Sequence, residues 1–292
     1  MSHGIGIVGV GVVGSAMLRL FGHRAIAYDI GPNSVRNREA INACDVAFVC
    51  VPTPAKADGG CDISCVEEVV AWLASPLIVL RSTVPPGTTD RLRSRHDKRI
   101  VFQPEYLGET PAHPFADLAN RDFIVLGGPI EDTTAAADLY KDVYNATLRF
   151  HFCDARTAEL AKYMENAFFA LKVTFVNEFY DIARACGVDF NLLREIWLAD
   201  ARIGRDHTFV YPNMRGFAGK CLPKDLSAIV QSALRQGYQP HLLQALLAIN
   251  ARFLELERKS GELHTGPSDQ AASSLGTLRD AEASPDPGRQ PR

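Results

Sequence analysis

Short apolar runs alternate with longer, more polar stretches through the first half of the chain. The runs are rich in Val and Ile and occupy residues 4–10, 25–28, 46–51, 77–81, 100–103 and 123–127. Strands that alternate with helical stretches are typical of βαβ units, whose strands lie parallel and are buried on both faces. The pattern therefore predicts an α/β fold over residues 1–150, built on a doubly wound parallel sheet.

After about residue 155, apolar residues recur three or four positions apart, which is the period of an amphipathic helix. They are Ala161, Met164, Phe168, Leu171, Phe175, Phe179 and Ile182. With Asp154 as a cap and Gly187 as a stop signal, this pattern predicts one helix over 155–186, about 45–50 Å long. One small domain cannot cover a helix of that length, so we expect a homodimer that forms through it.

A second periodic stretch follows near the end of the apolar part of the chain. It consists of Leu242, Leu246, Ile249, Phe253 and Leu256, and it predicts another helix with one apolar face. We therefore expect an all-helical dimerisation and substrate domain over 151–258. Residues 259–292 are rich in Ser, Pro, Gly and charge, and we expect a disordered tail there because they offer too little apolar surface to offset the entropy of ordering.

The composition favours small-molecule chemistry. The chain has 292 residues, 47% hydrophobic content and a net charge of -3 without a basic run, so we expect neither a nucleic acid nor a membrane surface as a partner. The N-terminus lacks the features of a signal peptide, and no apolar run reaches the roughly 18 residues that span a bilayer. We expect a cytoplasmic protein whose seven scattered cysteines are reduced thiols and hold no metal.

A glycine motif of the form GxGxxG follows the first apolar run and precedes the helical stretch 15–21. Its residues are Gly9, Val10, Gly11, Val12, Val13 and Gly14. In this context the glycines let the pyrophosphate of a dinucleotide approach the backbone and the start of a helix, as in a Rossmann-like domain. Asp29 ends the second run, where a carboxylate can bind the ribose 2′-hydroxyl. The sequence predicts NAD as the cofactor, although Arg36 and Arg38 leave NADP open.

Two further strand ends carry small and hydroxyl side chains. The segments are VPTP at 51–54 and STVPPGTT at 82–89. Ligands of doubly wound sheets bind at the carboxyl ends of the strands. We therefore expect cofactor contacts from Val51, Pro52, Thr53, Ser82 and Thr83.

Three later clusters combine residues that are suited to oxidation chemistry. They are PEYLGE with Glu105 and Glu109, AELAKYMEN with Lys162 and Asn166, and GFAGKCLPKD with Cys221, Lys224 and Asp225. Lys162 and Asn166 are four residues apart, so both project from one helix face and can donate to the same oxygen. A cation and an amide aimed at one point stabilise a developing oxyanion.

Cys221 is the candidate nucleophile. It follows a glycine-bearing segment and lies between Lys220 and Lys224, an electropositive setting that favours a thiolate. A thiolate beside a nicotinamide can hold an aldehyde as a thiohemiacetal that is then oxidised to a thioester. Glu105 or Glu109 could activate the water that hydrolyses the thioester.

In their order along residues 4–258, the motifs resemble one known family. The segments GVGVVG, VPTP, STVPPGTT, PEYLGE, AELAKYMENAFFALKVTFVNE, RIG and GKCLPKD are similar to the UDP-glucose/GDP-mannose dehydrogenases. The ordered set is far more specific than any single motif. The resemblance implies two successive hydride transfers to NAD, which turn the C6 alcohol of a nucleotide sugar into an acid, as in a UDP-glucose 6-dehydrogenase.

The resemblance also implies roles for individual residues. Cys221 would be the nucleophile, while Lys162, Asn166 and Asp225 would stabilise oxyanions and order water. Glu105 would be the base for thioester hydrolysis, Thr83 and Glu109 would line the nicotinamide with Lys224 beside the cofactor, and Arg202 would reach the substrate of a neighbouring subunit. The implied substrate contacts are Glu105, Tyr106, Leu107, Lys162, Asn166, Arg202, Tyr211, Phe217 and Gly219.

The chain departs from the family pattern in two places. Ala218 replaces one of the paired glycines before the cysteine, and the segment YPNMRGFAGKC is one residue longer. Members of the family also continue into a second Rossmann-like domain that grips the nucleotide, which residues 259–292 cannot build, so the sequence indicates a short form. Another chain could supply the missing contacts.

Three functions remain open on the sequence alone. The first is an active short dehydrogenase for a sugar or nucleotide sugar. The second is a β-hydroxyacid-type dehydrogenase, which shares the long helix and its lysine and asparagine but needs no thiol. The third is a non-catalytic subunit that binds NAD.

Overall fold

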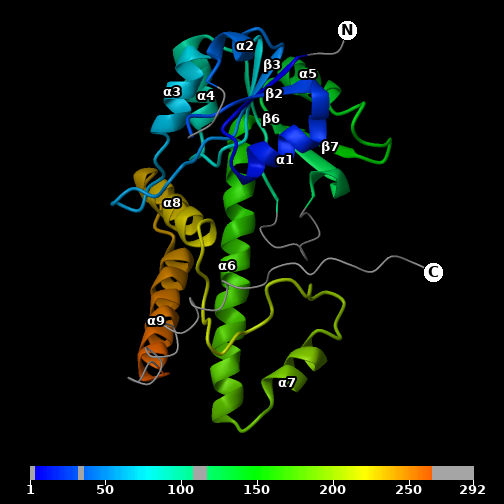
Figure 1. Cartoon of the computed structure of the whole chain (residues 1–292). Coiled ribbons are helices and arrows are strands. Elements are labelled where there is room, and N and C mark those ends of the chain that lie inside the picture. Colours follow the sequence, from blue (N-terminus) through cyan, green and yellow to red (C-terminus); the bar gives the residue numbers. More distant parts are fainter. Residues whose placement is uncertain (1–3, 32–35, 108–116, 265–292) are drawn as a thin grey trace, which may run out of the picture. The chain divides into compact units, whose positions relative to one another are not determined.

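The computed structural model describes residues 4–31, 36–107 and 117–264 (Figure 1). The chain divides into two compact units, and each is described by itself. The first unit contains residues 1–172 and 218–247, and the second contains residues 173–217 and the segment that begins at Ala248.

The first unit is built on a seven-stranded sheet in the order β2-β1-β3-β4-β5-β6-β7. Its strands are β1 (Ile5–Val8), β2 (Ala25–Tyr28), β3 (Val46–Val49), β4 (Leu77–Leu80), β5 (Ile100–Phe102), β6 (Phe123–Gly127) and β7 (Arg149–Cys153). Neighbouring strands are parallel except for β5 and β6, which pair antiparallel. The expected α/β class is confirmed, with this one antiparallel pair as a difference.

Strand β7 has no counterpart among the apolar runs of the sequence. Its residues, RFHFC, include a charged and an aromatic polar side chain, because β7 lies at the edge of the sheet and is mostly exposed or half-buried. A strand that is not buried on both faces lacks the continuous apolar run that reveals the central strands.

Helices cover both faces of this sheet (Figure 1). They include α1 (Val12–Phe21), α2 (Arg38–Asn42), α3 (Ser64–Trp72), α4 (Thr88–His96) and α5 (Ile130–Asp138), with short 3-10 turns at Gly22–Arg24 and Leu118–Asn120. Side chains alternate along each strand, so Ile5 and Ile7 join the core under α1 and α5, whereas Val8 joins the core under α2, α3 and α4. The two-sided core explains why the central strands read as unbroken apolar runs.

The sheet has a topological switch point at β1. From this strand the chain first pairs β2 on one side and later pairs β3 on the other. Loops that leave the carboxyl ends of β1 and β3 therefore diverge, and ligands of such folds bind at this point. Both the glycine turn and the VPTP segment leave the sheet at this point.

The long helix α6 spans Ala155–Ala185. The Asp154 side chain accepts hydrogen bonds from the backbone N–H and the hydroxyl of Thr157, at 2.8 and 2.6 Å. These bonds satisfy groups that the first helical turn leaves unpaired. At the other end Gly187 adopts a φ of 69° and ends the helix. The expected helix and its two end signals are confirmed.

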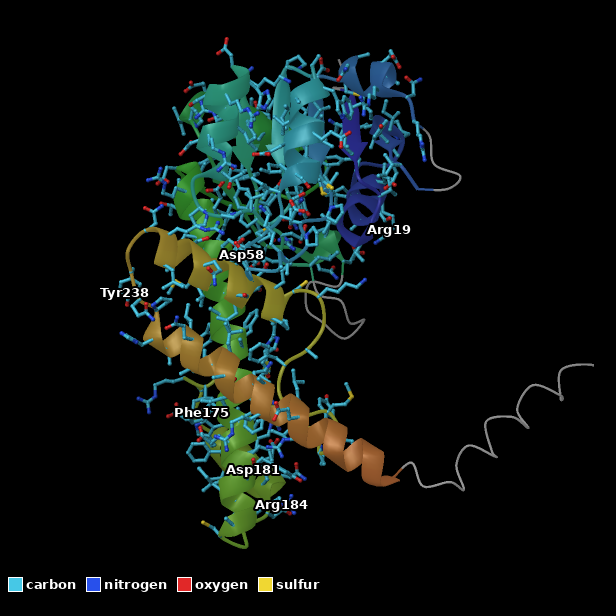
Figure 2. The ribbon with its side chains drawn as sticks, turned by 90° about the vertical axis from the view of Figure 1, so that its left-hand side faces the viewer. Arg19, Asp58, Phe175, Asp181, Arg184 and Tyr238 are labelled. Carbon is cyan, nitrogen blue, oxygen red and sulfur yellow. The ribbon has the colours of Figure 1, made fainter. Side chains whose placement is uncertain are left out.

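Two more helices contribute to the first unit. Helix α8 (Leu222–Arg235) belongs to it entirely, as does the start of α9 (His241–His264). Arg235 of α8 pairs at 2.9 Å with Asp58, which is labelled in Figure 2 and lies in the turn after β3. Helix α8 is therefore tied to a loop at the carboxyl edge of the sheet.

The second unit contains α7 (Phe190–Trp197) packed beside the later part of α6, where Phe175 and Trp197 have ring centroids 5.7 Å apart. The buried Arg215 binds Asp181 of α6 through two hydrogen bonds of 3.0 and 2.9 Å, and its Nε donates to Asn177. Figure 2 labels Phe175 and Asp181 on this helix. The segment before Cys221 is thus anchored at Arg215.

Helix α9 continues beyond the expected end of the helical region at residue 258. It extends to His264, so the predicted start of a tail at 259 is wrong by several residues. This segment has little apolar surface, but a helix end needs only backbone hydrogen bonds and good helix formers such as its Glu and Lys. Residues 265–292 lie outside the described part. Among the described residues, no helix is long and apolar enough to cross a membrane.

Candidate active site

The glycine turn after β1 has the geometry of a phosphate cradle. Gly9 has a φ of 91°, and a Cβ on it would lie 2.7 Å from the carbonyl oxygen of Cys50. A Cβ on Gly14 would collide with the carbonyl oxygen of Gly9. Gly11, in contrast, is exposed with no atom within 4 Å of its Cβ position. The first and third glycines permit close packing, and the second leaves open space at the start of α1.

Helix α1 begins directly behind that open space. Its cap residue is Gly11, which supplies no side-chain hydrogen bond, and its first turn holds no acidic residue. The N–H groups of a first turn point along the axis and favour a negative charge. Val10 and Val13 are half-buried and Val12 is exposed, so the approach is lined by backbone and apolar side chains. The residues present therefore fit the pyrophosphate of a dinucleotide.

Asp29 follows β2, the strand that pairs with β1. Its carboxylate accepts hydrogen bonds from the backbone N–H of Val10 at 2.5 Å and of Gly31 at 2.8 Å. These bonds, Val10 first, hold the pKa of Asp29 below its usual value. The carboxylate stays ionised beside the glycine turn, where it can accept from a ribose hydroxyl and repel a 2′-phosphate.

The ends of β3 and β4 are joined by side-chain hydrogen bonds. The Ser82 hydroxyl donates to the carbonyl of Val51 at 2.7 Å. The buried Cys61 thiol donates to the carbonyls of Thr53 and Thr83, at 3.9 and 3.6 Å. Thr53 is buried, Val51 and Thr83 are half-buried, and Pro52 is exposed. The structure thus brings together the residues that the sequence predicts as cofactor contacts at these two strands.

A polar chain links α6 to α8. Lys162 Nζ donates to Asn166 Oδ1 at 3.1 Å, and Asn166 Nδ2 donates to Asp225 Oδ2 at 2.6 Å. The other Asp225 oxygen pairs with Lys224. Asn166 and Asp225 are almost fully buried, whereas Lys162 is half-buried. Residues that lie far apart in the sequence therefore form one hydrogen-bonded group.

Cys221 lies at the start of α8. It follows a glycine-bearing segment and is the cap residue of a 14-residue helix with Pro223 in the first turn. Its carbonyl accepts from the N–H of Asp225 at 2.9 Å, and its side chain is exposed. The N-terminus of a helix favours an anion, so this position suits a thiolate. Gly219, with a φ of 85°, is exposed two residues earlier.

Glu105 is held by two buried guanidinium groups. Its Oε1 accepts from Arg121 at 2.9 Å and from the backbone N–H groups of Tyr106 and Leu107 at 2.7 and 2.6 Å. Its Oε2 pairs with Arg81. Burial lowers the pKa of both arginines. The two arginines and the two backbone N–H groups, which we call the Glu105 clamp, fix the orientation of the carboxylate.

Tyr106 connects this clamp to the long helix. Lys162 Nζ lies 5.0 Å from the centroid of the Tyr106 ring, and the Arg121 guanidinium lies 5.5 Å from it. Cations at this distance are attracted to the face of an aromatic ring. The segment that carries Glu105, Tyr106 and Leu107 is therefore placed against the part of α6 that carries Lys162.

Three predicted substrate contacts belong to the second unit. Arg202 is exposed and binds Asp200, and Tyr211 is also exposed. Phe217 is buried, and its backbone N–H donates at 2.7 Å to Asn250 of α9. Their roles in substrate binding stay predictions. The predicted cofactor contact Glu109 lies outside the described residues.

Four residues of the first unit escape the sequence analysis. Arg81, Arg121, Glu159 and Tyr163 are all buried, and they pack among the groups described above. Arg81 could be found from the sequence, because it is a charged residue at the end of the apolar run 77–81. Glu159 precedes Lys162 by three residues and therefore shares its helix face.

The fold and this site define a dinucleotide-binding protein of the Rossmann class that carries a lysine, asparagine and aspartate group and a cysteine at a helix start. The comparisons with known proteins agree. Residues 33–147 match the NAD binding domain of the UDP-glucose/GDP-mannose dehydrogenase family, and residues 156–252 match its central domain. The chain belongs to the UDP-glucose/GDP-mannose dehydrogenase family, and its cofactor is NAD.

Several relatives show how far the similarity extends. The UDP-glucose 6-dehydrogenase of Pseudomonas aeruginosa is 34% identical over 249 residues, which cover 78% of this chain and 53% of that protein. The structure of a UDP-glucose dehydrogenase from Pyrobaculum islandicum superposes with a TM-score of 0.76 at 29% identity, covering 86% of this chain and 68% of that one. The chain spans about half the length of the curated relatives it matches.

A more distant structure shares the fold. The 3-hydroxyisobutyrate dehydrogenase of Mycobacterium tuberculosis has a TM-score of 0.67 at 18% identity and covers 87% of this chain and 94% of that one. At this identity the likeness concerns the fold alone.

Proposed function

We propose that this chain is a NAD-dependent dehydrogenase that oxidises the primary alcohol of a sugar or nucleotide sugar to the carboxylic acid through a covalent intermediate on Cys221. The observation that carries the proposal is the hydrogen-bonded group of Lys162, Asn166 and Asp225, with Cys221 at the start of the helix that bears Asp225. A lysine and an amide that can donate to one oxygen, linked to a carboxylate on the helix that starts at a cysteine, are the groups that such an oxidation requires.

Lys162, Asn166 and Cys221 each have a step in the reaction, and Asp225 holds Asn166 through their hydrogen bond. When bound, NAD would supply the acceptor for the hydride that leaves the substrate carbon in each oxidation, and the proton of the alcohol would leave to water. Lys162 and Asn166 would donate to the substrate oxygen as it gains negative charge. The Cys221 thiolate would then add to the aldehyde carbon and form a thiohemiacetal, which would become a thioester when the same carbon gives up a second hydride.

Release of the acid needs water. Attack by water on the thioester carbon breaks the carbon–sulfur bond and returns the thiol of Cys221. Glu105 would take the proton of that water, and its two arginines would hold it in place for this task. Each acid formed therefore requires two NAD molecules.

The substrate class follows from the relatives. Curated relatives carry the names UDP-glucose 6-dehydrogenase and GDP-mannose 6-dehydrogenase. A nucleotide sugar is accordingly the proposed substrate, with Arg202 reaching the substrate of a neighbouring subunit. Its side chain is 89% exposed within its own unit, which leaves it available to a second chain.

The test of the proposed function is the stoichiometry of NADH. Purified protein is incubated with NAD and a panel of sugars, UDP-sugars and GDP-sugars, and NADH and acid are both quantified. Two NADH per acid are expected from a UDP- or GDP-sugar. One NADH per substrate without acid would favour a β-hydroxyacid-type reaction instead, and NAD binding without turnover would favour a binding subunit.

The chain is further proposed to form a homodimer through α6. This helix carries apolar side chains that are 40–75% exposed along its length, namely Leu160, Met164, Phe168, Phe175, Phe179 and Ile182. They recur three, four or seven positions apart and so lie on one stripe. A contiguous exposed apolar stripe marks a protein interface, and a second copy offers the same stripe in return.

Substitution in this stripe is expected to separate the dimer. Phe168→Glu combined with Ile182→Glu places two charges in the proposed interface, so sedimentation at micromolar concentration should change from dimer to monomer. Ile130→Glu is the matched control, since Ile130 is 65% exposed on α5 and away from the stripe. A double variant that sediments like the wild-type dimer would refute this interface.

A further inference from the structure

Glu159 is a buried carboxylate to which the proposed reaction assigns no role. It lies on α6 with no exposed surface, one helical turn before Lys162. Its Oε1 accepts from the backbone N–H and the hydroxyl of Thr89, at 2.8 and 2.6 Å. Its Oε2 accepts from the backbone N–H of Gly87 at 2.5 Å. Three donors from one short segment thus converge on this side chain.

That segment is the turn between β4 and α4. Gly87 is the cap residue of α4 and adopts a φ of 88°. Because it is a glycine, it has no side chain that could bind the first N–H groups of the helix. Glu159 supplies these hydrogen bonds from another element. The turn contains Ser82 and Thr83, the proposed cofactor contacts, and ends at Thr89. Its two ends are therefore held by Val51 through Ser82 and by Glu159 through Thr89.

Burying a charged carboxylate costs free energy unless hydrogen bonds to the carboxylate compensate for the lost water. Burial raises the pKa of Glu159 to about 7, against the hydrogen bonds from Thr89 and Gly87 that act in the opposite direction. Asp90 of α4 adds to the increase. A glutamine or an apolar residue would fill the same space without this penalty. Because a carboxylate is present despite this penalty, we infer that its role is to accept the three hydrogen bonds from Gly87 and Thr89.

We propose that Glu159 is a positioning residue that fixes the cofactor-side turn 82–89 at a set distance from Lys162 and Asn166. All three side chains project from one face of α6, because they lie three and four residues apart. One helix therefore carries both the support of the turn that bears Thr83 and the donors for the substrate oxygen. This inference rests on the proposed dehydrogenase function.

Loss of this support should slow the chemical step more than it weakens NAD binding. The glycine turn and Asp29, which would bind the other end of the cofactor, make no contact with Glu159 among the hydrogen bonds of the described residues. We expect Glu159→Ala to lower kcat by about 100-fold and to change the Kd of NAD by less than about 3-fold. Glu159→Gln keeps one carbonyl acceptor but turns an amide N–H toward a donor, so a decrease of about 10-fold is expected.

The test compares both variants with Glu131→Gln, an exposed carboxylate on α5, in the full-length protein. Calorimetry gives the Kd of NAD, NADH formation gives kcat, and hydrogen exchange followed by mass spectrometry reports the backbone amides of 87–90. We expect faster exchange in this peptide for both Glu159 variants, partial rescue by Gln relative to Ala, and no change for the control.

Two results would overturn the inference. One is a folded Glu159→Gln variant with wild-type exchange at 87–90, and the other is a parallel loss of kcat and NAD affinity in both variants. Should Glu159→Ala fail to fold, the Gln variant alone decides. If the wild-type protein forms no NADH from any sugar, the proposed function fails, while the exchange measurement still decides whether Glu159 holds the turn.

Discussion

Cys221→Ala is expected to abolish formation of the carboxylic acid, with a decrease on the order of 1000-fold or more in its rate. The second oxidation needs a tetrahedral carbon that bears both a hydrogen and an oxygen. The proposed thiohemiacetal supplies this carbon, whereas a free aldehyde does not. Without the thiol, the reaction should stop after the first oxidation, with at most one NADH per substrate.

The position of Cys221 makes the thiol the expected site of this effect. The residue is exposed, lies at the N-terminus of α8 and is followed four residues later by Asp225, which binds Asn166. A helix N-terminus and two adjacent lysines favour a negative charge on the sulfur. The large expected loss therefore comes from chemistry and not from packing, because an exposed side chain contributes little to the core.

Cys186→Ala is the matched control, because Cys186 is also an exposed cysteine but lies after α6 in the second unit. It should form acid at the wild-type rate. Acid and NADH are measured together by chromatography and absorbance. Acid formation by Cys221→Ala at a rate within about 10-fold of wild type would refute a covalent intermediate on this residue.

The elements that the sequence predicts well are those with strong periodicity. The buried strands β1, β3 and β4 and the helix α6 follow from apolar spacing and from end signals such as Asp154 and Gly187. Strand β7 and helix α8 were missed. The exposed edge position of β7 breaks up its apolar run, and α8 begins at Cys221, where glycines immediately upstream suggest a loop.

Some residues of the candidate site can likewise be predicted from the sequence, and others cannot. Motifs identify Lys162, Asn166, Asp225 and Cys221, because the chemistry of each residue type is visible in the sequence. Partners that support them are not visible, since a buried arginine or glutamate reads as a surface residue until its neighbours are known. The clamp on Glu105 is the clearest case: Arg81 and Arg121 come from different strand ends, and only the sheet order places both beside one carboxylate.

Glu105→Gln is expected to lower the free energy of unfolding by about 3–5 kcal/mol. The substitution keeps the shape of the side chain but removes the negative charge between two guanidinium groups. The side chains of Arg81 and Arg121 are only 2% and 4% exposed, so water cannot replace the lost charge. Urea unfolding at neutral pH, followed by circular dichroism, measures the change.

The charges of the Glu105 clamp also predict a smaller loss of stability when one of the two arginines is removed. Arg81→Met should cost less than Glu105→Gln, because it leaves one arginine with one carboxylate and no uncompensated charge. Glu68→Gln is the control for an exposed pair, since Glu68 meets Arg38 at 3.5 Å on the surface, and it should change the free energy by less than about 1 kcal/mol. Equal urea midpoints for Glu105→Gln and wild type would show that the two arginines do not depend on Glu105. Its orientation for the proposed hydrolysis step would then need another source.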